Sequence, residues 1–252
     1  AEDLVGDILP VKIKNQSMCW RLGLTMHLVA LMGMENLFLA LMDTPDEVKK
    51  LVDRIADELI RLLRWQESEG LLTLNNGNDY AGAGSYGFSD ELPAAGFPGK
   101  VRLCDQWCNL NSQETVGVSP DVYKEVFFPA YERIAALFGL VYYGCCEPVH
   151  EIWKPCLSSL SNLRKVSISP WCNEEMMGES LRGSKIIYSR KPSPVFLGVE
   201  GSFDEALYAE HIRKTLKAAE GCPLELIHRD VYTLSGDRQK AGRAVKLIRS
   251  LL

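Results

Sequence analysis

The sequence predicts an α/β fold in which helices and strands alternate, and within that class it favours a (β/α)8 barrel. Three observations support this prediction. Amphipathic helical segments are each followed by a short apolar segment along most of the chain. These short segments are too apolar to have a face in water, which is typical of parallel strands covered by helices. The length of 252 residues matches the usual size of one such barrel.

The clearest helix is expected over residues 45–69. Thr44 stands at the N-cap position, a proline opens the first turn, and Glu47 lies three residues after the cap, which is the pattern of a capping box. Apolar residues then recur at helical spacing until Gly70, a residue type that commonly ends helices. A strand is expected directly afterwards, over the apolar residues 71–74.

The same order of helix and strand recurs downstream. Ser119 and Pro120 begin a helix that extends to about residue 138, Gly139 ends it, and residues 140–143 form an apolar strand. Further units pair helices over 148–160, 174–181 and 204–219 with strands over 165–169, 185–188 and 224–228, before a last helix over 238–252. Weaker strand candidates are residues 7–13 and 101–103.

The number of expected strands approaches eight without reaching it. We therefore expect a single barrel domain over residues 1–252 that lacks its N-terminal portion, and the first residue is Ala rather than Met. A doubly wound sheet is the alternative. No G-x-G-x-x-G pattern follows any expected strand, so the strongest sign of a dinucleotide site is missing and the barrel is favoured.

Composition and charge exclude several classes of protein. The apolar content of 46% and the charged content of 24% are ordinary for a globular protein and exclude a disordered or collagen-like chain. A net charge of −5 argues against a nucleic-acid or anionic-membrane surface, because phosphate groups need a dense basic stripe. The eight cysteines have no framework spacing, and no leader or long uninterrupted apolar run is visible. We therefore expect reduced thiols and a cytoplasmic location.

A long loop of glycines, amides and aromatic residues follows the strand expected at 71–74. In a barrel the active site lies where strands end, so this position favours a role in ligand binding. Its glycines allow a ligand to approach the backbone closely, and we expect Asn76, Asn78, Asp79 and Tyr86 to contact a substrate. A flexible surface loop is the competing interpretation, since the lysine of a phosphate-binding loop is missing.

The junction after the strand at 140–143 contains two thiols and a carboxyl group, on Cys145, Cys146 and Glu147. A thiolate there could bind zinc or act as a nucleophile, and the start of the following helix would lower its pKa. Strand alternation places Tyr143 and Cys145 on one side and Cys146 on the other, so the two thiols are not expected to face one metal ion. Buried structural cysteines are the alternative.

Two other places contain candidate site residues. His228 and Asp230 share a strand face at the end of the last apolar strand, where one could bind metal or move protons while the other orients it. A structural pair is equally compatible with this pattern. Trp107 and Gln113 could form a pocket wall, although a structural role is favoured for them. Cys172, after the strand at 165–169, could supply a second sulfur ligand.

Three segments resemble parts of a known family. Residues 118–134 have the sequence VSPDVYKEVFFPAYERI, residues 139–145 follow with GLVYYGC, and a helix near 32–41 precedes TPDEV at 44–48. These segments resemble the uroporphyrinogen decarboxylase superfamily, and the similarity extends from about residue 20 to residue 250. The fold that this resemblance implies is a (β/α)8 barrel.

The resemblance implies methyl transfer as the activity. Corrinoid-linked methyltransferases of this superfamily carry H-x-C-G after the same strand, and they hold zinc with that His, that Cys and a later Cys. Here Tyr143 stands at the histidine position, where it would face the substrate, Cys145 matches the cysteine, and residues 228–231 contain no later cysteine. A similar zinc site would combine Cys145 with His228 or Asp230, helped by Glu147 as a catalytic group.

The expected reaction moves a methyl group between a corrinoid (methylcobalamin) on a partner protein and a small acceptor such as a thiol. One alternative is a decarboxylase that removes carboxylates from a tetrapyrrole without metal, although its MRQAGR and GFxGxPWT segments are absent. Another is a non-catalytic barrel that binds a corrinoid or a tetrapyrrole. We expect no nucleic-acid or membrane partner, and a homodimer is compatible with the sequence.

Overall fold

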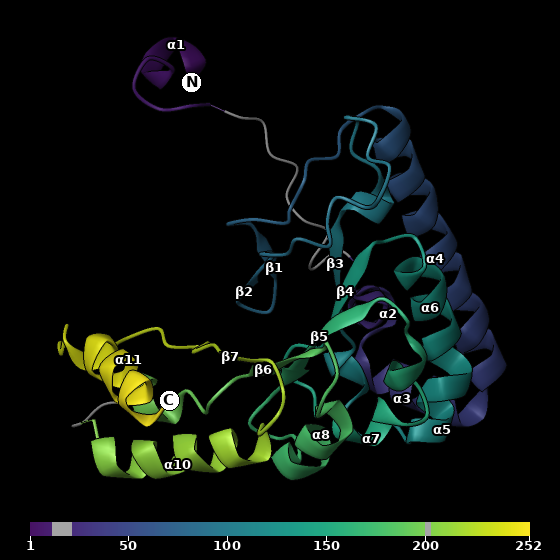
Figure 1. The fold of residues 1–252 in the computed structure, drawn as a ribbon. Helices are drawn as coiled ribbons and strands as arrows, with labels where there is room; N and C mark the ends of the chain where they lie inside the picture. Colours follow the sequence, from purple (N-terminus) through teal and green to yellow (C-terminus); the bar gives the residue numbers. More distant parts are fainter. Residues whose placement is uncertain (12–21, 200–202) are drawn as a thin grey trace.

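A computed structural model describes residues 1–11, 22–199 and 203–252 of the chain. Its centre is a five-stranded parallel sheet with the order β3-β4-β5-β6-β7 (Figure 1). The strands are β3 (Trp107–Leu110), β4 (Leu140–Tyr143), β5 (Leu163–Ile168), β6 (Ile187–Arg190) and β7 (Leu224–Leu226). Helical segments connect consecutive strands, so the predicted α/β class with a parallel sheet is confirmed.

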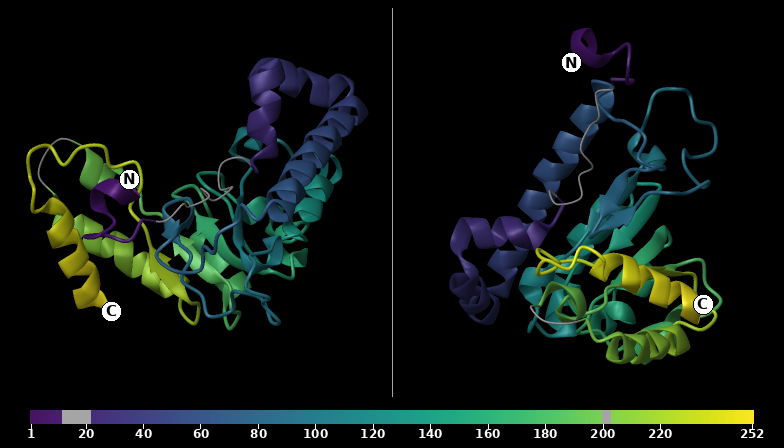
Figure 2. Two further views of the ribbon diagram at one scale, coloured as in Figure 1. Left: turned by 90° about the horizontal axis from the view of Figure 1, so that it is seen from above. Right: turned by 90° about the vertical axis from the view of Figure 1, so that its left-hand side faces the viewer.

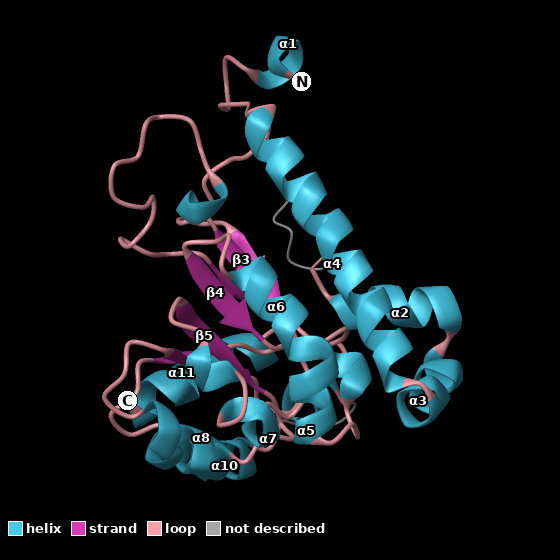
Figure 3. Ribbon diagram, turned by 90° about the vertical axis from the view of Figure 1, so that its right-hand side faces the viewer, coloured by secondary structure: helices cyan, strands magenta, loops and turns pink. Residues whose placement is uncertain are grey.

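Helices cover one face of this sheet. Figure 3 shows α4 (Pro45–Ser68) and α6 (Phe128–Ala135) packed in front of the strands. Crossovers between parallel strands are almost always right-handed, and because the strand order runs in one direction, such crossovers place their helices on the same side. The strand residues buried in the main core with these helices are apolar, and they include Cys108, Leu110, Val141, Val166 and Ile168.

Two pairs of helices lie at opposite ends of the sheet. Figure 2 shows α2 (Leu24–Met32) and α3 (Met34–Asp43) beside α4, far from α10 (Glu205–Ala218) and α11 (Lys240–Leu251). Among the described residues, no single helix has the length and apolar character to cross a membrane, and α2 and α3 meet that test only as a pair bent by 100°.

Of two predicted helix N-caps, one is present in the structure and the other is not. The helix that begins at Ser119 has the expected cap, because the Ser119 side chain accepts a hydrogen bond from the Val122 amide. Thr44 occupies the N-cap position of α4, but its hydroxyl donates to the Ala40 carbonyl at 3.4 Å, so the predicted capping box is wrong. Gly70 ends the helix as predicted, with φ of +70°.

The predicted helices agree with the structure in place and differ in detail. The segment predicted over 119–138 consists of α5 (Pro120–Val122), a wider π-helical turn (Tyr123–Phe127) and α6. Pro129 lacks an amide hydrogen, which prevents a regular helical hydrogen bond at this point. The segment over 148–160 contains only α7 (His150–Trp153) and a 3₁₀ turn (Leu157–Ser159), whereas α8 (Glu174–Leu181) has the predicted bounds.

Three strand predictions are wrong or incomplete. Residues 71–74 have no strand partner, and residues 101–103 lead into a 3₁₀ turn (Leu103–Asp105). Residues 7 and 8 belong to a turn, residues 9–11 are in no strand, and the rest of the candidate over 7–13 lies outside the described residues. Strand β3 and the antiparallel hairpin of β1 (Tyr80–Gly82) and β2 (Ser85–Tyr86) were not predicted from the sequence. Two further short helices are α1 (Glu2–Val5) and α9 (Val195–Gly198).

Candidate active site

The face of the sheet opposite the helices carries several buried polar side chains beside a small apolar cluster. Strand alternation gives this face the side chains that the apolar core does not use. Register places Asn109 beside Tyr142 and Lys165 in one row, and Ser167 beside Ser189 in another. The hairpin of β1 and β2 lies against this face, since a Cβ atom on Gly82 would be only 2.4 Å from the Asn109 side chain. The hairpin therefore covers polar side chains of this face.

Two adjacent thiols stand at the carboxyl end of β4. Cys145 is buried, Cys146 is exposed, and their Sγ atoms are 3.6 Å apart. The prediction that they face opposite sides is wrong, because the strand ends at Tyr143 and Gly144 has φ of +98°, which breaks the alternation. Nη1 of Arg229, which follows β7, donates a hydrogen bond to Cys145 Sγ at 2.9 Å.

The two thiols have different acidities. A hydrogen bond in which either thiol can be the donor joins the two sulfurs, and this contact with Cys145, together with the nearby charge of Arg229, lowers the pKa of Cys146 to about 7. The same contact and burial raise the pKa of Cys145. At neutral pH a substantial fraction of Cys146 is therefore thiolate, which is the nucleophilic form of cysteine.

A cavity of about 610 Å³ lies directly beside Cys146. Its wall also contains Gln113 from the loop after β3, Glu147 after β4 and Trp171 after β5. These three residues follow the carboxyl ends of neighbouring parallel strands. Active sites in such sheets usually lie at these ends. Gln113 thus lines a cavity, and its predicted contact with a substrate stays a prediction. A ligand bound in this cavity would contact the thiol of Cys146.

Glu147 connects the loops after β3 and β4. Its buried carboxylate accepts hydrogen bonds from the backbone amides of Ser112 and Cys145, each at 2.9 Å. Burial raises the pKa of this carboxyl group. Because both of its oxygens are held by backbone amides, the structure gives Glu147 a positioning role next to the thiols.

A buried lysine lies deeper on the polar face. Lys191, directly after β6, donates hydrogen bonds to the Tyr142 hydroxyl at 2.5 Å and to Ser189 Oγ at 3.1 Å. Among the described residues, no carboxylate lies within ion-pair distance of its ammonium group. Burial lowers the pKa of Lys191 to about 7, so this amine exchanges its proton near neutral pH.

A second lysine on this face is fully paired. Lys165 Nζ contacts Glu225 Oε2 at 3.4 Å, Ser85 Oγ at 2.8 Å and the Tyr86 carbonyl at 2.6 Å. It also lies 5.4 Å from the ring centre of Trp107. Burial lowers the pKa of Lys165, and the charge of Glu225 opposes that change. These contacts fix the hairpin against β5 and β7.

The structure does not bring His228 to Cys145, whereas Asp230 lies near enough to Cys146 for its charge to oppose the lowering of the Cys146 pKa. Nε2 of His228 is 2.5 Å from the hydroxyl of Tyr208 on α10, and burial lowers the pKa of this histidine to about 4. Asp230 has φ of +58°, which ends the extended backbone between the two residues. The side chain that reaches the thiols from this segment is Arg229, the residue between them.

The other predicted binding residues are distributed over both faces of the sheet. Trp107 is buried and donates its ring N–H to the Gly87 carbonyl, while Tyr143 lies on the helical face with its hydroxyl 2.5 Å from that of Tyr123. Tyr143 therefore packs in the core, away from the cavity. In the loop, Asn76 donates to the Leu92 carbonyl, Asp79 accepts from the Gly77 amide, and Asn78 and Tyr86 are exposed.

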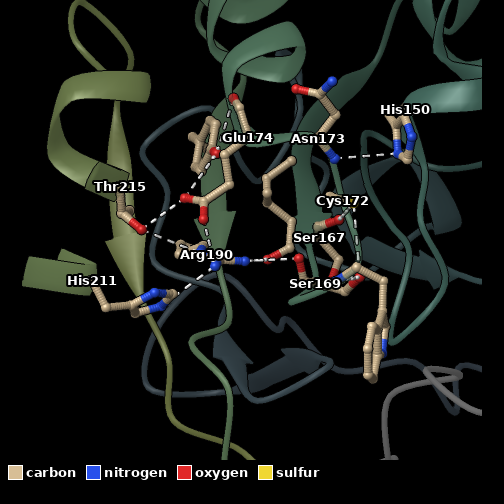
Figure 4. Close-up of polar contacts among 12 residues, drawn as sticks. His150, Ser167, Ser169, Cys172, Asn173, Glu174, Arg190, His211 and Thr215 are labelled. Carbon is tan, nitrogen blue, oxygen red and sulfur yellow. Dashed lines mark hydrogen bonds and ion pairs between the residues drawn. The ribbon is translucent and has the colours of Figure 1, made fainter. Parts of the chain in front are cut away.

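A buried ionic network supports the strand that precedes Lys191. Arg190 pairs with Glu174 at 2.6 Å, donates to the Ser169 carbonyl at 2.7 Å and lies near Thr215 and His211 of α10 (Figure 4). Arg190 is only 2% exposed, so its charge depends on Glu174 for compensation. The network joins β6, α8 and α10.

The described side chains do not form the zinc site that the resemblance implies. Within the described residues, no group of three or more His, Cys, Asp or Glu side chains is arranged to hold a metal ion. The group beside Cys145 Sγ is the Arg229 guanidinium, whose positive charge opposes a second cation at the same sulfur. Cys172 accepts a hydrogen bond from the Val149 amide instead of pairing with Cys145.

Three cationic residues of this site were not predicted from the sequence, namely Lys165, Lys191 and Arg229. Lys191 and Arg229 both follow a strand closely, which is the rule that selected the other candidates. Lys165 is a charged residue within an otherwise apolar strand, which was a usable signal.

Comparison with known proteins adds no identification. No protein-family model, no curated protein and no solved structure matches this chain.

Proposed function

We propose that the protein is an enzyme with a (β/α)8 barrel of the uroporphyrinogen decarboxylase type. Its reaction would move a methyl group between a corrinoid on a partner protein and a small acceptor such as a thiol. The observation that carries this proposal is the exposed Cys146 beside a cavity at the carboxyl ends of the strands, with Cys145 and Arg229 stabilising its thiolate. Thiolates and their neighbouring cations are suited to activating a thiol acceptor.

In this proposal Cys146 acts as the base for the acceptor. An acceptor thiol enters the cavity and transfers its proton to the Cys146 thiolate. The acceptor sulfur then uses its electron pair to bond the methyl carbon, while the carbon–cobalt bond breaks and its electron pair stays with the corrinoid. Cys146 returns its proton to solvent. The residues of this chain supply the base, the orientation of the acceptor and the walls of the cavity, and no step passes through zinc.

Turnover of methylcobalamin tests the proposal. The full chain is mixed with methylcobalamin and 2-mercaptoethanol, and the absorbance of methylcobalamin is followed under exclusion of light and oxygen. We expect turnover with the wild-type chain and with Cys222→Ser, a matched thiol variant away from the cavity, and a strong loss with Cys146→Ser. Absence of wild-type turnover overturns the proposal, and corrinoid binding without turnover favours the non-catalytic alternative.

Metal analysis tests the zinc hypothesis separately. The zinc content of purified wild-type protein is compared with that of Cys145→Ser. We expect no stoichiometric zinc that depends on Cys145, because Arg229 contacts the sulfur of this residue. Stoichiometric zinc that is lost in the variant would restore the metal-activated scheme.

The decarboxylase is retained as a second candidate because of the cations on the polar face. Among the described residues Lys191 has no carboxylate within ion-pair distance, and Arg229 is a further cation at the same end of the sheet. A substrate with several carboxylates would bring negative charge to the buried Lys191 ammonium group. Release of carbon dioxide from uroporphyrinogen, compared between wild type and Lys191→Met, distinguishes this reaction from methyl transfer.

A further inference from the structure

We propose that Cys146 and Cys145 act as an attacking and a resolving thiol that together reduce a low-molecular-weight disulfide. This activity is distinct from methyl transfer and does not rest on it, since it needs only the two thiols and their surroundings. The substrate class is a small disulfide that fits a cavity of about 610 Å³.

The positions of the two sulfurs match these two roles. Cys146 is exposed and lines the cavity, so a disulfide bound there meets its sulfur first. Cys145 is 1% exposed, which shields it from direct attack by the substrate, yet its Sγ lies only 3.6 Å from that of Cys146. The two sulfurs that would bond in the resolving step therefore already lie close to each other.

The charges around the pair favour this chemistry. Thiol–disulfide exchange needs a thiolate as the attacking group, and a thiol with pKa near the ambient pH is the most effective attacker. The pKa of Cys146 is lowered to about 7 by its contact with Cys145 and by Arg229. The guanidinium of Arg229, 2.9 Å from Cys145 Sγ, stabilises the negative charge that this sulfur needs when it resolves the intermediate.

The reaction balances with the two protein thiols as reductant. The Cys146 thiolate attacks one sulfur of the substrate, a mixed disulfide forms, and the other half of the substrate leaves as a thiolate that takes a proton from solvent. Cys145 then loses its proton and attacks Cys146 Sγ, so that the second half leaves in the same way. The products are two small thiols and a disulfide between adjacent cysteines.

The disulfide so formed is expected to open again easily. Consecutive Cα atoms are about 3.8 Å apart, which is shorter than the usual span of a disulfide. Strained disulfides have more oxidising potentials and are the labile or catalytic ones. Two equivalents of a different small thiol would reduce the pair and complete the cycle, so the protein would exchange electrons between small thiols and disulfides.

Mass spectrometry of the native full chain tests the proposal. Fully reduced protein is treated with bis(2-hydroxyethyl) disulfide, quenched with acid, and analysed as intact protein and as peptides. We expect wild type and Cys222→Ser to lose two hydrogens, and the peptide that contains residues 145 and 146 to carry the loss. We expect Cys145→Ser to accumulate a stable mixed disulfide on Cys146, because the resolving thiol is absent.

Two results would contradict the proposal that the two thiols reduce a disulfide. A stable mixed disulfide on Cys146 in the wild type would show that Cys145 does not resolve it. Oxidation confined to other cysteines would show that the pair is not the reactive site. Both readings come from the wild-type chain, so they hold even if a variant fails to fold. They also do not depend on methylcobalamin, so failure here leaves the methyl transfer proposal to its own assay.

Discussion

The guanidinium of Arg229 donates a hydrogen bond to the sulfur of Cys145 across 2.9 Å, although 84 positions separate the two residues in the chain. The contact joins the loop after β7 to the loop after β4. It places a permanent positive charge next to a pair of thiols, and this charge adds to the contact with Cys145 in lowering the pKa of Cys146.

The reactivity of Cys146 is expected to depend on pH with a midpoint near 7, the value to which its pKa is lowered. Replacing Arg229 with Gln removes the cation and should raise the midpoint by on the order of one unit. The rate of alkylation by iodoacetamide, mapped to Cys146 by peptide analysis, gives the profile. Arg238→Gln, which changes an exposed arginine, serves as control. An unchanged midpoint in Arg229→Gln would contradict the role given to Arg229.

Lys191 is expected to reduce stability in a pH-dependent manner. Burial lowers its pKa to about 7 in the folded state, against about 10.4 in an unfolded chain. Below pH 7 the lysine is charged in both states, so the folded protein carries the full cost of a buried charge. Between these two pKa values the unfolded chain binds more protons, so the cost falls as pH rises, and above the higher value it is absent.

Lys191→Met should therefore stabilise the protein at pH 6 by several kcal/mol and by much less near pH 10. Urea unfolding at the two pH values measures the difference. The exposed Lys185→Met is the matched control and should change little at either pH. A gain that is equal at both pH values would show that packing, and not charge, determines the effect.

The ion pair between Arg190 and Glu174 should contribute strongly to stability. Glu174→Gln leaves the buried guanidinium without its countercharge, and we expect a loss of about 3 kcal/mol in the free energy of unfolding. Glu175→Gln, on the next and exposed position of the same helix, should change it by less than about 0.5 kcal/mol. Equal effects of the two variants in denaturant unfolding would be inconsistent with this network.

Two helical glycines should respond in opposite ways to alanine. A Cβ atom on Gly178 of α8 would lie 1.8 Å from the Ala218 carbonyl oxygen, so Gly178→Ala should force α8 from α10 and cost about 2 kcal/mol. A Cβ atom on Gly242 of α11 meets nothing within 4 Å, so Gly242→Ala should stabilise by about 0.5–1 kcal/mol. Thermal unfolding of both variants checks the signs.

The sequence predicted most of the helices because their signals are local. The cap at Ser119 and the helix end at Gly70 depend on a few neighbouring residues, so the local sequence is sufficient to predict them. Strands were harder to predict. Residues 71–74 are apolar, but they pair with no other strand. Strand β3 is buried on both faces, but it contains the polar Asn109, so it does not have the continuous apolar pattern expected of a buried strand.

The sequence predicted where the candidate site lies, but not all of the residues that form it. The rule that active sites follow parallel strands led to Cys145, Cys146 and Glu147. It could not tell which residue after β7 reaches them, because the backbone turns at Asp230 and leaves Arg229, not His228, beside the thiols. Such contacts depend on how distant segments pack, and no local pattern contains that information.

The carboxylate of Glu147, held by the amides of Ser112 and Cys145, has a consequence for ligand binding. Because this one side chain spans two loops, the width between two walls of the cavity is set when the chain folds. A ligand that enters does not have to order those loops itself, so less conformational entropy is lost at the moment of binding. The cavity should therefore discriminate among ligands by size, as a rigid opening does, rather than adapt to each of them.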